Sequence, residues 1–382
     1  MSSIGHDESL RERLAALRAR AGRHPAGTID CYVGTPCDPV PQIVDDAVMA
    51  SIAQSGPYPM SPGSIAYRDA ASRWITRRFS VDVGRDGVAA CVGTKEFVAS
   101  LPRFLRAAQL VGAERDTVLL PSIAYPTYAV GAQLAGMRAV AVPLDDDWLL
   151  DLDALDPDDV ARAAVLWLNV PGNPTASVAP REHFETVAAW GRAHDVLVVS
   201  DECYVEFADA PHSIVETGLE GVLALHSLSK RSNFAGMRAG FYAGDPNIVA
   251  RLVDVRREAG LIVPTPVQAA TIAALDDDAH VQTQAQRYVD RRTFVLERLA
   301  AHGIVHCGGA MPMYLWLRES DAGRDRSGLD LAERFADAGW LLAPGSTFGA
   351  AGSPYARLAL VQPDDRLHEA LDRFDQLAAR NP

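Results

Sequence analysis

The sequence lacks the features that mark several large classes of protein. No run approaches the roughly 18 consecutive apolar residues that a membrane-spanning helix needs, and the first 30 residues hold no apolar core of signal-peptide length. The five cysteines are scattered and odd in number, and the ten histidines form no HxxxH or HExxH cluster. We therefore expect a cytoplasmic protein without a membrane segment, a disulfide framework or a metal site.

Two nucleotide-binding patterns are missing as well. No GxGxxG follows the first predicted strand and no GxxxxGK[ST] is present, which excludes the common dinucleotide and P-loop sites. The 36 Lys and Arg residues are outnumbered by 49 Asp and Glu residues, so the formal net charge is −13. Because polyanions are held by a positive field, we expect no nucleic acid partner and no anionic membrane surface. A small anionic ligand is still compatible, since it responds to a few local charges.

The length of the chain and its alternation of apolar and helical segments are typical of an α/β enzyme. Its 382 residues suggest about two domains. Continuous apolar runs separated by helical stretches predict a mostly parallel, seven-stranded sheet covered on both faces. The predicted strands are Val88–Val92, Thr117–Pro121, Arg138–Val142, Ala163–Leu168, Val196–Ser200, Val222–His226 and Ala239–Ala243.

The pattern changes after about Pro264. One long helical region (Val267–Ala301) is followed by the predicted strands Tyr314–Leu317 and Ala356–Val361 and by a closing helix, which is typical of a smaller α+β domain. We expect an N-terminal arm (residues 1–45) that joins this small domain, a large ligand-binding domain (46–265) and the small domain itself (266–382).

A lysine stands at the end of one predicted strand. The segment SLSK, which ends at Lys230, directly follows Val222–His226. Desolvation there disfavours the charged amine and would make it a nucleophile able to form a Schiff base. Eight residues later, Arg238 offers a planar fork suited to a phosphate. Taken alone, Lys230 could equally be a surface residue.

Three further segments follow predicted strands. Asp201 ends the strand before SLSK, where a carboxylate could keep a pyridine nitrogen protonated and Tyr204 could donate its phenol to a ring oxygen. Asn173 stands in a rigid turn with two prolines. Gly93 and Thr94 open a predicted helix whose backbone N–H groups suit an anion. Each has a plain alternative, such as an ordinary turn aspartate for Asp201.

Together these motifs resemble the fold-type-I aminotransferases that use pyridoxal 5′-phosphate (PLP). The resemblance rests on NPT at Asn173, DxxY at Asp201 and SxSK at Lys230 with the distal Arg238, and it spans most of the chain. It implies that Lys230 holds PLP covalently and moves a proton between the substrate α-carbon and the cofactor. It implies that Asp201 pairs with the pyridine nitrogen, that Asn173 and Tyr204 contact the 3′-oxygen, and that Tyr125 stacks on the ring or packs in the core. The residues it places around the phosphate are Gly93, Thr94, Lys95, Ser227, Ser229 and Arg238.

The same resemblance extends to the substrate and to a partner subunit. Arg357, on an alternating strand near the C-terminus, resembles the arginine that clamps the substrate α-carboxylate, and Gly34 resembles the arm glycine beside it. Asn173 would contact the substrate too. Tyr58 resembles the tyrosine that one subunit lends to the phosphate of its neighbour, which implies a homodimer with shared active sites.

Within this family the sequence is most similar to the actinobacterial succinyldiaminopimelate transaminases. PSIAYPTY (121–128), HSLSKRSNFAGMRAG (226–240) and VPTPVQAA (263–270) carry that likeness. It implies amino transfer between glutamate and N-succinyl-2-amino-6-oxopimelate in lysine and diaminopimelate biosynthesis, with amino acids and 2-oxo acids as substrates. The chain has Ala176 where the family pattern has glycine, and Met311 and Met313 leave open an altered substrate pocket. An aminotransferase of specialised metabolism and a PLP-dependent lyase or cyclase are the alternatives.

Overall fold

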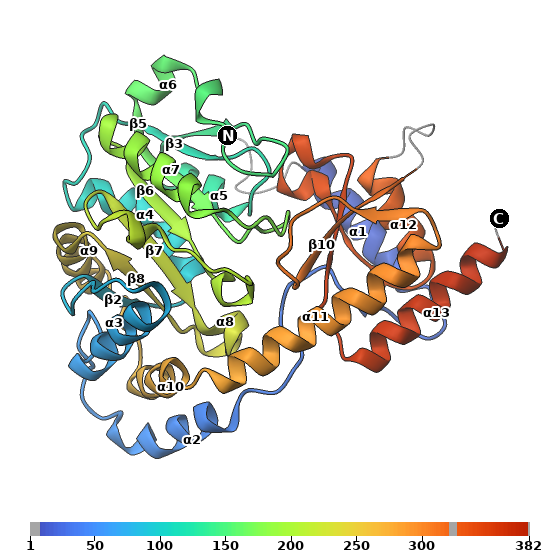
Figure 1. The fold of residues 1–382 in the computed structure, drawn as a ribbon, viewed down its shortest axis with the longest axis horizontal. Coiled ribbons are helices and arrows are strands. Elements are labelled where there is room, and N and C mark those ends of the chain that lie inside the picture. The colour runs from blue at the N-terminus through green and yellow to red at the C-terminus, as the bar shows by residue number, and fades with distance from the viewer. Residues whose placement is uncertain (1–7, 321–326, 381–382) are drawn as a thin grey trace.

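The computed structural model describes residues 8–320 and 327–380, which form two lobes (Figure 1). The large lobe is built around a seven-stranded sheet, and the small lobe around a four-stranded sheet. Helix α11 (Ala279–Ala300) runs from the large lobe into the small one.

The large sheet confirms the predicted α/β architecture. Its order is β2-β8-β7-β6-β5-β3-β4, and strands β3 to β7 are parallel to one another, whereas β8 is antiparallel to both of its neighbours. The strands are β2 (Val88–Cys91), β3 (Thr117–Pro121), β4 (Arg138–Val142), β5 (Ala163–Asn169), β6 (Leu197–Asp201), β7 (Val222–Ser227) and β8 (Gly240–Gly244). Each lies within two residues of the run that predicts it.

Both faces of this sheet are covered, because successive side chains of a strand point to opposite sides. Along β5, Leu166 and Leu168 belong to one apolar cluster, and Val165 and Trp167 belong to another. The first cluster includes side chains of α3 and α7, and the second includes side chains of α4, α5 and α9. The helices of this lobe are α3 (Ile65–Phe79), α4 (Thr94–Ala107), α5 (Thr127–Leu134), α6 (Pro157–Ala161), α7 (Arg181–Ala193) and α9 (Pro246–Glu258).

The small lobe contains an antiparallel sheet of order β12-β13-β10-β9. The N-terminal segment joins it, since β1 pairs in parallel with β11. These strands are β1 (Ile29–Asp30), β9 (Ile304–His306), β10 (Tyr314–Glu319), β11 (Trp340–Leu341), β12 (Ala343–Pro344) and β13 (Ala356–Ala359). The helices of the small lobe are α1 (Glu8–Ala21), α12 (Gly328–Asp337) and α13 (Asp364–Arg380).

The helical region predicted over 267–301 is present, and the structure divides it at Asp277 and Asp278 into α10 (Thr265–Asp276) and α11. Asp277 has an extended backbone, and its carboxylate accepts the N–H of Ala279 at 2.9 Å. Short aspartate side chains compete for backbone donors in this way and end helices. Helix α10 packs against α2 (Gln42–Ser51) and α3 of the large lobe. We propose that the domain boundary falls near Asp277 rather than at residue 265.

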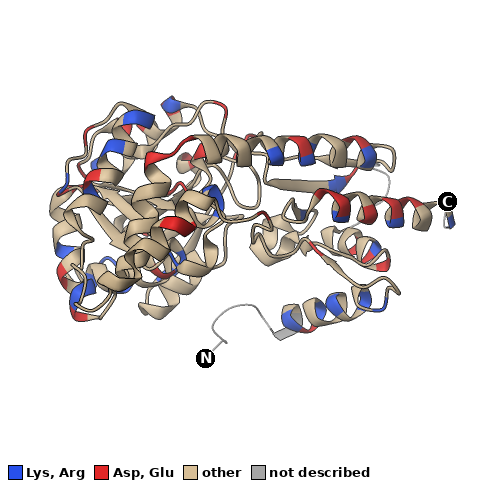
Figure 2. Ribbon diagram, turned by 90° about the horizontal axis from the view of Figure 1, so that it is seen from below, with Lys and Arg blue, Asp and Glu red and all other residues tan. Residues whose placement is uncertain are grey.

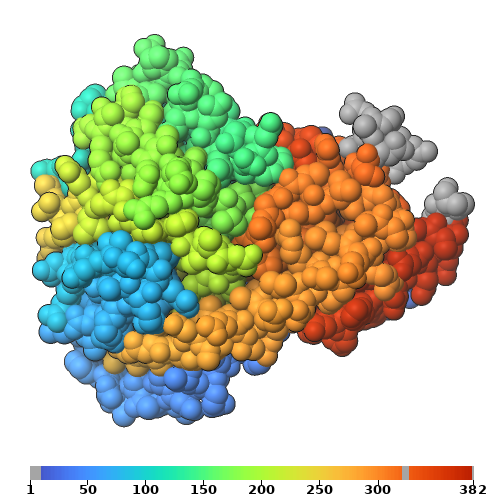
Figure 3. Space-filling view, viewed as in Figure 1, coloured from blue at the N-terminus to red at the C-terminus, as the bar shows by residue number. Residues whose placement is uncertain are grey.

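Charged residues of both signs are interspersed over both lobes (Figure 2). Helices α2 and α10 lie at the surface along one border of the molecule (Figure 3). Within residues 8–320 and 327–380, no helix has the length and apolar character needed to cross a membrane, and no group of three or more His, Cys, Asp or Glu residues could hold a metal ion. All five cysteines are free thiols.

Candidate active site

A cavity of about 660 Å³ lies at the carboxyl ends of β5, β6 and β7. Parallel strands bring their last residues to one edge of the sheet, and ligands of α/β proteins bind there. Strands β10 and β13 of the small lobe also line the cavity, as does the N-terminal segment. Twelve residues that the sequence predicts for the site line it: Gly34, Thr94, Lys95, Tyr125, Asn173, Asp201, Tyr204, Ser227, Ser229, Lys230, Arg238 and Arg357.

Two predicted site residues do not line the cavity. Gly93 lies beside it, against the Arg238 guanidinium; a Cβ at Gly93 would stand 2.3 Å from Nη2 of Arg238. Tyr58 lies outside the cavity, with 95% of its surface exposed in the single chain. The expectation that it acts in a neighbouring subunit stays a prediction.

Lys230 lies in α8 (Leu228–Arg231), a single turn that follows β7. The hydroxyl of Ser227 caps this turn by accepting the Ser229 N–H at 3.1 Å. Burial lowers the pKa of Lys230 to about 8, and the charges of the nearby Arg357 and Arg238 act in the same direction. The Lys230 amine donates a hydrogen bond to the Gly34 carbonyl oxygen. At pH 7 about a tenth of this amine is therefore uncharged and nucleophilic, far more than for a lysine with the ordinary pKa of 10.5.

Asp201 ends β6, and its buried carboxylate faces the cavity. The Tyr128 hydroxyl donates to Oδ2 at 2.9 Å, and the Cys203 N–H donates to Oδ1 at 3.4 Å. The Asn169 side-chain amide holds the Asp201 carbonyl oxygen at 2.9 Å. Burial raises the pKa of Asp201, while these hydrogen bonds favour its ionised form. None of its hydrogen-bond partners within the described residues is cationic, so a protonated ring nitrogen would complete the site.

A chain of polar contacts connects the small lobe with the large one. Arg357 Nη1 donates to Asn173 Oδ1 at 2.7 Å, and Asn173 Nδ2 donates to the Tyr204 hydroxyl at 3.4 Å. The hydroxyls of Tyr204 and Tyr314 lie 3.0 Å apart. The Arg357 guanidinium carbon lies 4.6 Å from the centre of the Tyr314 ring and 4.7 Å from that of Phe348. Arg357 Nε is buried and has no hydrogen-bond partner among the described residues.

The other end of the cavity is built for an anion. Gly93 precedes α4 with a φ of 74°, a left-handed conformation that glycine adopts without strain, and the first N–H groups of α4 have no partners within the helix. Arg238 also has a positive φ, of 58°, and its Nη1 donates to the Ala235 carbonyl oxygen at 2.8 Å. A helix N-terminus and a guanidinium together favour a phosphate.

Several cavity residues are missing from the prediction. Tyr128, Tyr314 and Cys203 line the cavity, and all three form hydrogen bonds with predicted residues. The composition also points to this site. The chain contains two lysines, Lys95 and Lys230, among its 36 basic residues, and both line the cavity.

Two departures from the family pattern have a structural explanation. Ala176 is buried with a φ of 58°, the left-handed conformation that explains why relatives would have glycine there. Met311 and Met313 are fully buried in the apolar core of the small lobe and are not cavity residues. Any effect of these methionines on the substrate pocket would therefore be indirect, through Tyr314, which follows Met313 and lines the cavity, and it stays a prediction.

These features fit PLP. The anion site suits its phosphate, the Asp201 carboxylate suits a protonated pyridine nitrogen, and the amine with a lowered pKa suits covalent attachment to its aldehyde.

Comparison with known proteins identifies the family. Residues 32–374 match the family "Aminotransferase class I and II". A probable aminotransferase of Mycobacterium tuberculosis (strain ATCC 25618 / H37Rv) is 42% identical over 371 residues, which cover 95% of this chain and 84% of that protein. The 4-dedimethylamino-4-oxo-anhydrotetracycline transaminase OxyQ of Streptomyces rimosus is 38% identical over 370 residues, covering 94% of this chain and 97% of that protein.

A solved structure agrees with these relatives. A probable N-succinyldiaminopimelate aminotransferase from Thermus thermophilus superposes with a TM-score of 0.84 at 30% identity, covering 97% of this chain and 99% of the other. The chain therefore belongs to the class I and II aminotransferases, enzymes of fold type I whose cofactor is pyridoxal phosphate.

Proposed function

We propose that this aminotransferase moves an amino group between glutamate and N-succinyl-2-amino-6-oxopimelate. The observation that carries the proposal is the charge of the cavity, which is lined by Lys95, Lys230, Arg238 and Arg357 but by one carboxylate, that of Asp201. Such a balance inside a protein of net charge −13 favours a phosphate, bound by Lys95 and Arg238, together with the α-carboxylate of a substrate, bound by Arg357. The likeness to the Thermus thermophilus protein supports the same substrate class.

In this proposal Lys230 performs the proton transfer. PLP, when bound, withdraws electrons from the substrate α-carbon and so makes the proton on that carbon acidic. The amine of Lys230 takes this proton and returns it on the cofactor side, which requires the uncharged form that burial favours. Its carbonyl partner, Gly34, holds the amine within the cavity before the cofactor is attached.

Other residues hold the ring. Asp201 would accept a hydrogen bond from the ring nitrogen and stabilise its positive charge, with Tyr128 fixing the carboxylate. Asn173 and Tyr204 would contact the 3′-oxygen, and the half-buried Tyr125 would stack on the ring. The phosphate would be bound by Gly93, Thr94, Lys95, Ser227, Ser229 and Arg238.

Arg357 would bind the α-carboxylate of the substrate, beside Gly34 and Asn173. Its guanidinium is already fixed by Asn173 and by the carbonyl oxygen of Tyr32, and it lies against two aromatic rings. A charge-assisted hydrogen bond to a carboxylate contributes about 1.5–3 kcal/mol. Because the guanidinium is already fixed, little of this free energy is lost to ordering the side chain when the substrate binds. The bound carboxylate then orients the α-carbon toward Lys230.

We also propose that the enzyme is a cytoplasmic homodimer. Large apolar side chains are exposed on α2 and on the segment that follows it, namely Ile43, Met49, Ile52, Tyr58, Met60 and Ile65. Apolar surface of this kind favours a protein partner, and the resemblance to the family indicates a second copy of the chain. Tyr58 would then reach the phosphate of the neighbouring subunit.

A second candidate is an aminotransferase of specialised metabolism, favoured by the 38% identity to the Streptomyces rimosus transaminase. The relatives named above are aminotransferases, which favours amino transfer over the lyase and cyclase alternatives. The test is a screen of amino donors and 2-oxo acid acceptors that includes the glutamate/2-oxoglutarate and N-succinyl-diaminopimelate pairs. Failure on the succinylated substrate together with robust turnover of another amino acid would refute the first candidate and support the second.

A further inference from the structure

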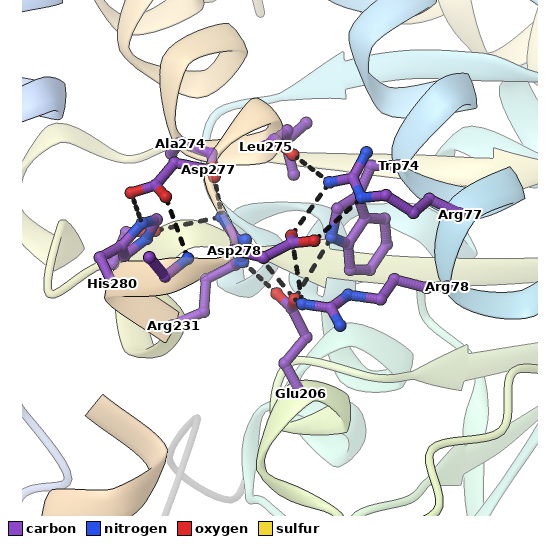
Figure 4. Close-up of polar contacts among 12 residues, drawn as sticks. Trp74, Arg77, Arg78, Glu206, Arg231, Ala274, Leu275, Asp277, Asp278 and His280 are labelled. Atoms are coloured by element: carbon purple, nitrogen blue, oxygen red, sulfur yellow. Dashed lines mark hydrogen bonds and ion pairs between the residues drawn. The ribbon is translucent and has the colours of Figure 1, made fainter. Parts of the chain in front are cut away.

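The residue after Lys230, Arg231, belongs to a cluster of charged side chains that do not line the cavity (Figure 4). Arg231 ends α8 with a side chain that is 6% exposed, and its Nε donates to Oε2 of Glu206. Glu206 is 5% exposed and lies in the short 3₁₀ helix η3 (Val205–Phe207), two residues after Tyr204. One buried ion pair therefore ties the segment of Lys230 to the segment of Tyr204.

The Glu206 carboxylate has further donors on its other side. Arg78 Nη2 lies 2.7 Å from Oε1, and Trp74 Nε1 lies 3.3 Å from the same oxygen; both residues belong to α3. Arg78 is in turn 3.2 Å from a carboxylate oxygen of Asp278, at the start of α11 (Figure 4). Each buried charge thus has a partner of opposite sign, a condition for tolerating charges in a low-dielectric interior.

The residues that follow Lys230 are also attached to α10 and α11. Arg231 Nη1 donates to the Ala274 carbonyl oxygen at 2.8 Å. The Ser232 hydroxyl lies 2.9 Å from His280 Nε2, and Asn233 Nδ2 donates to Gln284 Oε1 at 2.9 Å. Three consecutive side chains therefore anchor the backbone just beyond the catalytic lysine.

We propose that Glu206 and Arg231 are positioning residues, whose ion pair fixes where the amine of Lys230 stands relative to Asp201. Neither side chain lines the cavity, so their effect on the chemistry is transmitted through the backbone. Helix α8 has four residues and cannot hold its own geometry as a longer helix does. If Glu206 loses its charge, the buried Arg231 loses its ion-pair partner and must move, and the adjacent Lys230 moves with it. The inference rests on the role proposed above for Lys230.

The test compares Glu206→Gln, which keeps the shape of the side chain, with Asp278→Asn. The control variant disturbs Arg77 and Arg78 in the same cluster but leaves the pair of Glu206 and Arg231 in place. PLP is added to the cofactor-free protein, and its covalent attachment is followed by visible absorbance and located by borohydride reduction and peptide mass spectrometry. Steady-state kcat and KM for glutamate, or for the best donor of the screen above, are measured on the holoenzymes.

We expect Glu206→Gln to slow attachment and to lower kcat, each by about 10- to 100-fold, because misplacing a reacting group by about 1 Å has effects of this size. KM should change by less than about three-fold, since the groups that bind substrate are untouched. Asp278→Asn should lower thermal stability while attachment and kcat stay near wild type.

The proposal is overturned if folded Glu206→Gln attaches PLP and turns over like the wild type, or if Asp278→Asn slows attachment equally. Should Glu206→Gln fail to fold by circular dichroism, Arg231→Lys replaces it. Arg231→Lys keeps the charge but loses the planar fork, and it should slow attachment as well; wild-type attachment in that variant would overturn the proposal. If the wild-type protein itself forms no adduct on Lys230, the failure lies with the proposed function and not with this pair.

Discussion

Gly34 is a position where the addition of one methyl group should disturb the active site. A Cβ on Gly34 would lie 2.3 Å from the Tyr314 hydroxyl oxygen and 3.1 Å from Cε1 and Cζ of the same ring. Ordinary contact begins near 3.4 Å, so the hydroxyl would have to move by about 3.4 − 2.3 = 1.1 Å. The φ of Gly34 is not in the left-handed region, and therefore the substitution Gly34→Ala adds no backbone strain.

The movement has a cost in stability and a cost in rate. The Tyr314 hydroxyl is bonded to the buried Tyr204 hydroxyl at 3.0 Å, and an unpaired buried hydroxyl costs about 1–3 kcal/mol. The Arg357 guanidinium, 4.6 Å from the centre of the Tyr314 ring, would shift with the ring. Since a displacement of about 1 Å can cost about 100-fold in rate, we expect kcat/KM of Gly34→Ala to fall by about that factor.

Denaturant unfolding measures the expected loss of stability, and steady-state kinetics measure the expected fall in kcat/KM. The double variant Gly34→Ala/Tyr314→Phe removes the atom that would lie 2.3 Å away and leaves the nearest ring atoms at 3.1 Å. We expect it to unfold at a higher denaturant concentration than Gly34→Ala alone. Wild-type stability and kcat/KM in Gly34→Ala, or no recovery in the double variant, would refute this reasoning.

Three further predictions use other residues. The rate at which PLP attaches to Lys230 should rise with pH and level off above a midpoint near 8, because burial lowers the pKa of the amine to about 8; a midpoint near the ordinary 10.5 would contradict this. Ala176→Gly relieves about 1–2 kcal/mol of left-handed backbone strain. It also loses about 0.8 kcal/mol from burial of the methyl group and about 0.5–1 kcal/mol from the greater entropy of the unfolded chain. The free energy of unfolding, measured with denaturant, should therefore change by less than about 1 kcal/mol. Tyr58→Phe should weaken PLP binding in a fluorescence titration without changing the stability of the cofactor-free protein, since it removes only the hydroxyl proposed to reach the phosphate and keeps the ring. Unchanged PLP affinity would argue against its role in a neighbouring subunit.

The large sheet was predictable because its signal is local. Each buried strand is a short apolar run, and Asp201 and Ser227 come at the ends of two such runs, so their meeting at one edge follows from parallel pairing. The break between α10 and α11 was not predictable from apolar spacing alone. It depends on the side chain of Asp277 and on Arg77 and Arg78 of α3, which hold Asp278 from a distant part of the chain.

The residues missed in the site are those whose role comes from tertiary packing. Tyr314 reaches Tyr204 because the small lobe places β10 against the cavity, and no spacing in the sequence encodes that contact. Tyr128 reaches Asp201 because α5 packs beside β3, which leaves its hydroxyl over the end of β6. That Met313 is buried in the core of the small lobe likewise could not be read from the sequence, since its neighbours are supplied by tertiary packing.

The role of Lys230 is the central claim, and the composition of the chain makes its test unusually direct. Besides the N-terminus, Lys95 and Lys230 are the primary amines of the whole sequence. Borohydride reduction of the PLP-loaded protein, followed by peptide mass spectrometry, should place the reduced cofactor on Lys230. In Lys230→Ala both the adduct and turnover should disappear, whereas Lys95→Arg should keep the adduct. An adduct on Lys95 or the N-terminus instead, or amino transfer by Lys230→Ala at the wild-type rate, would contradict the account.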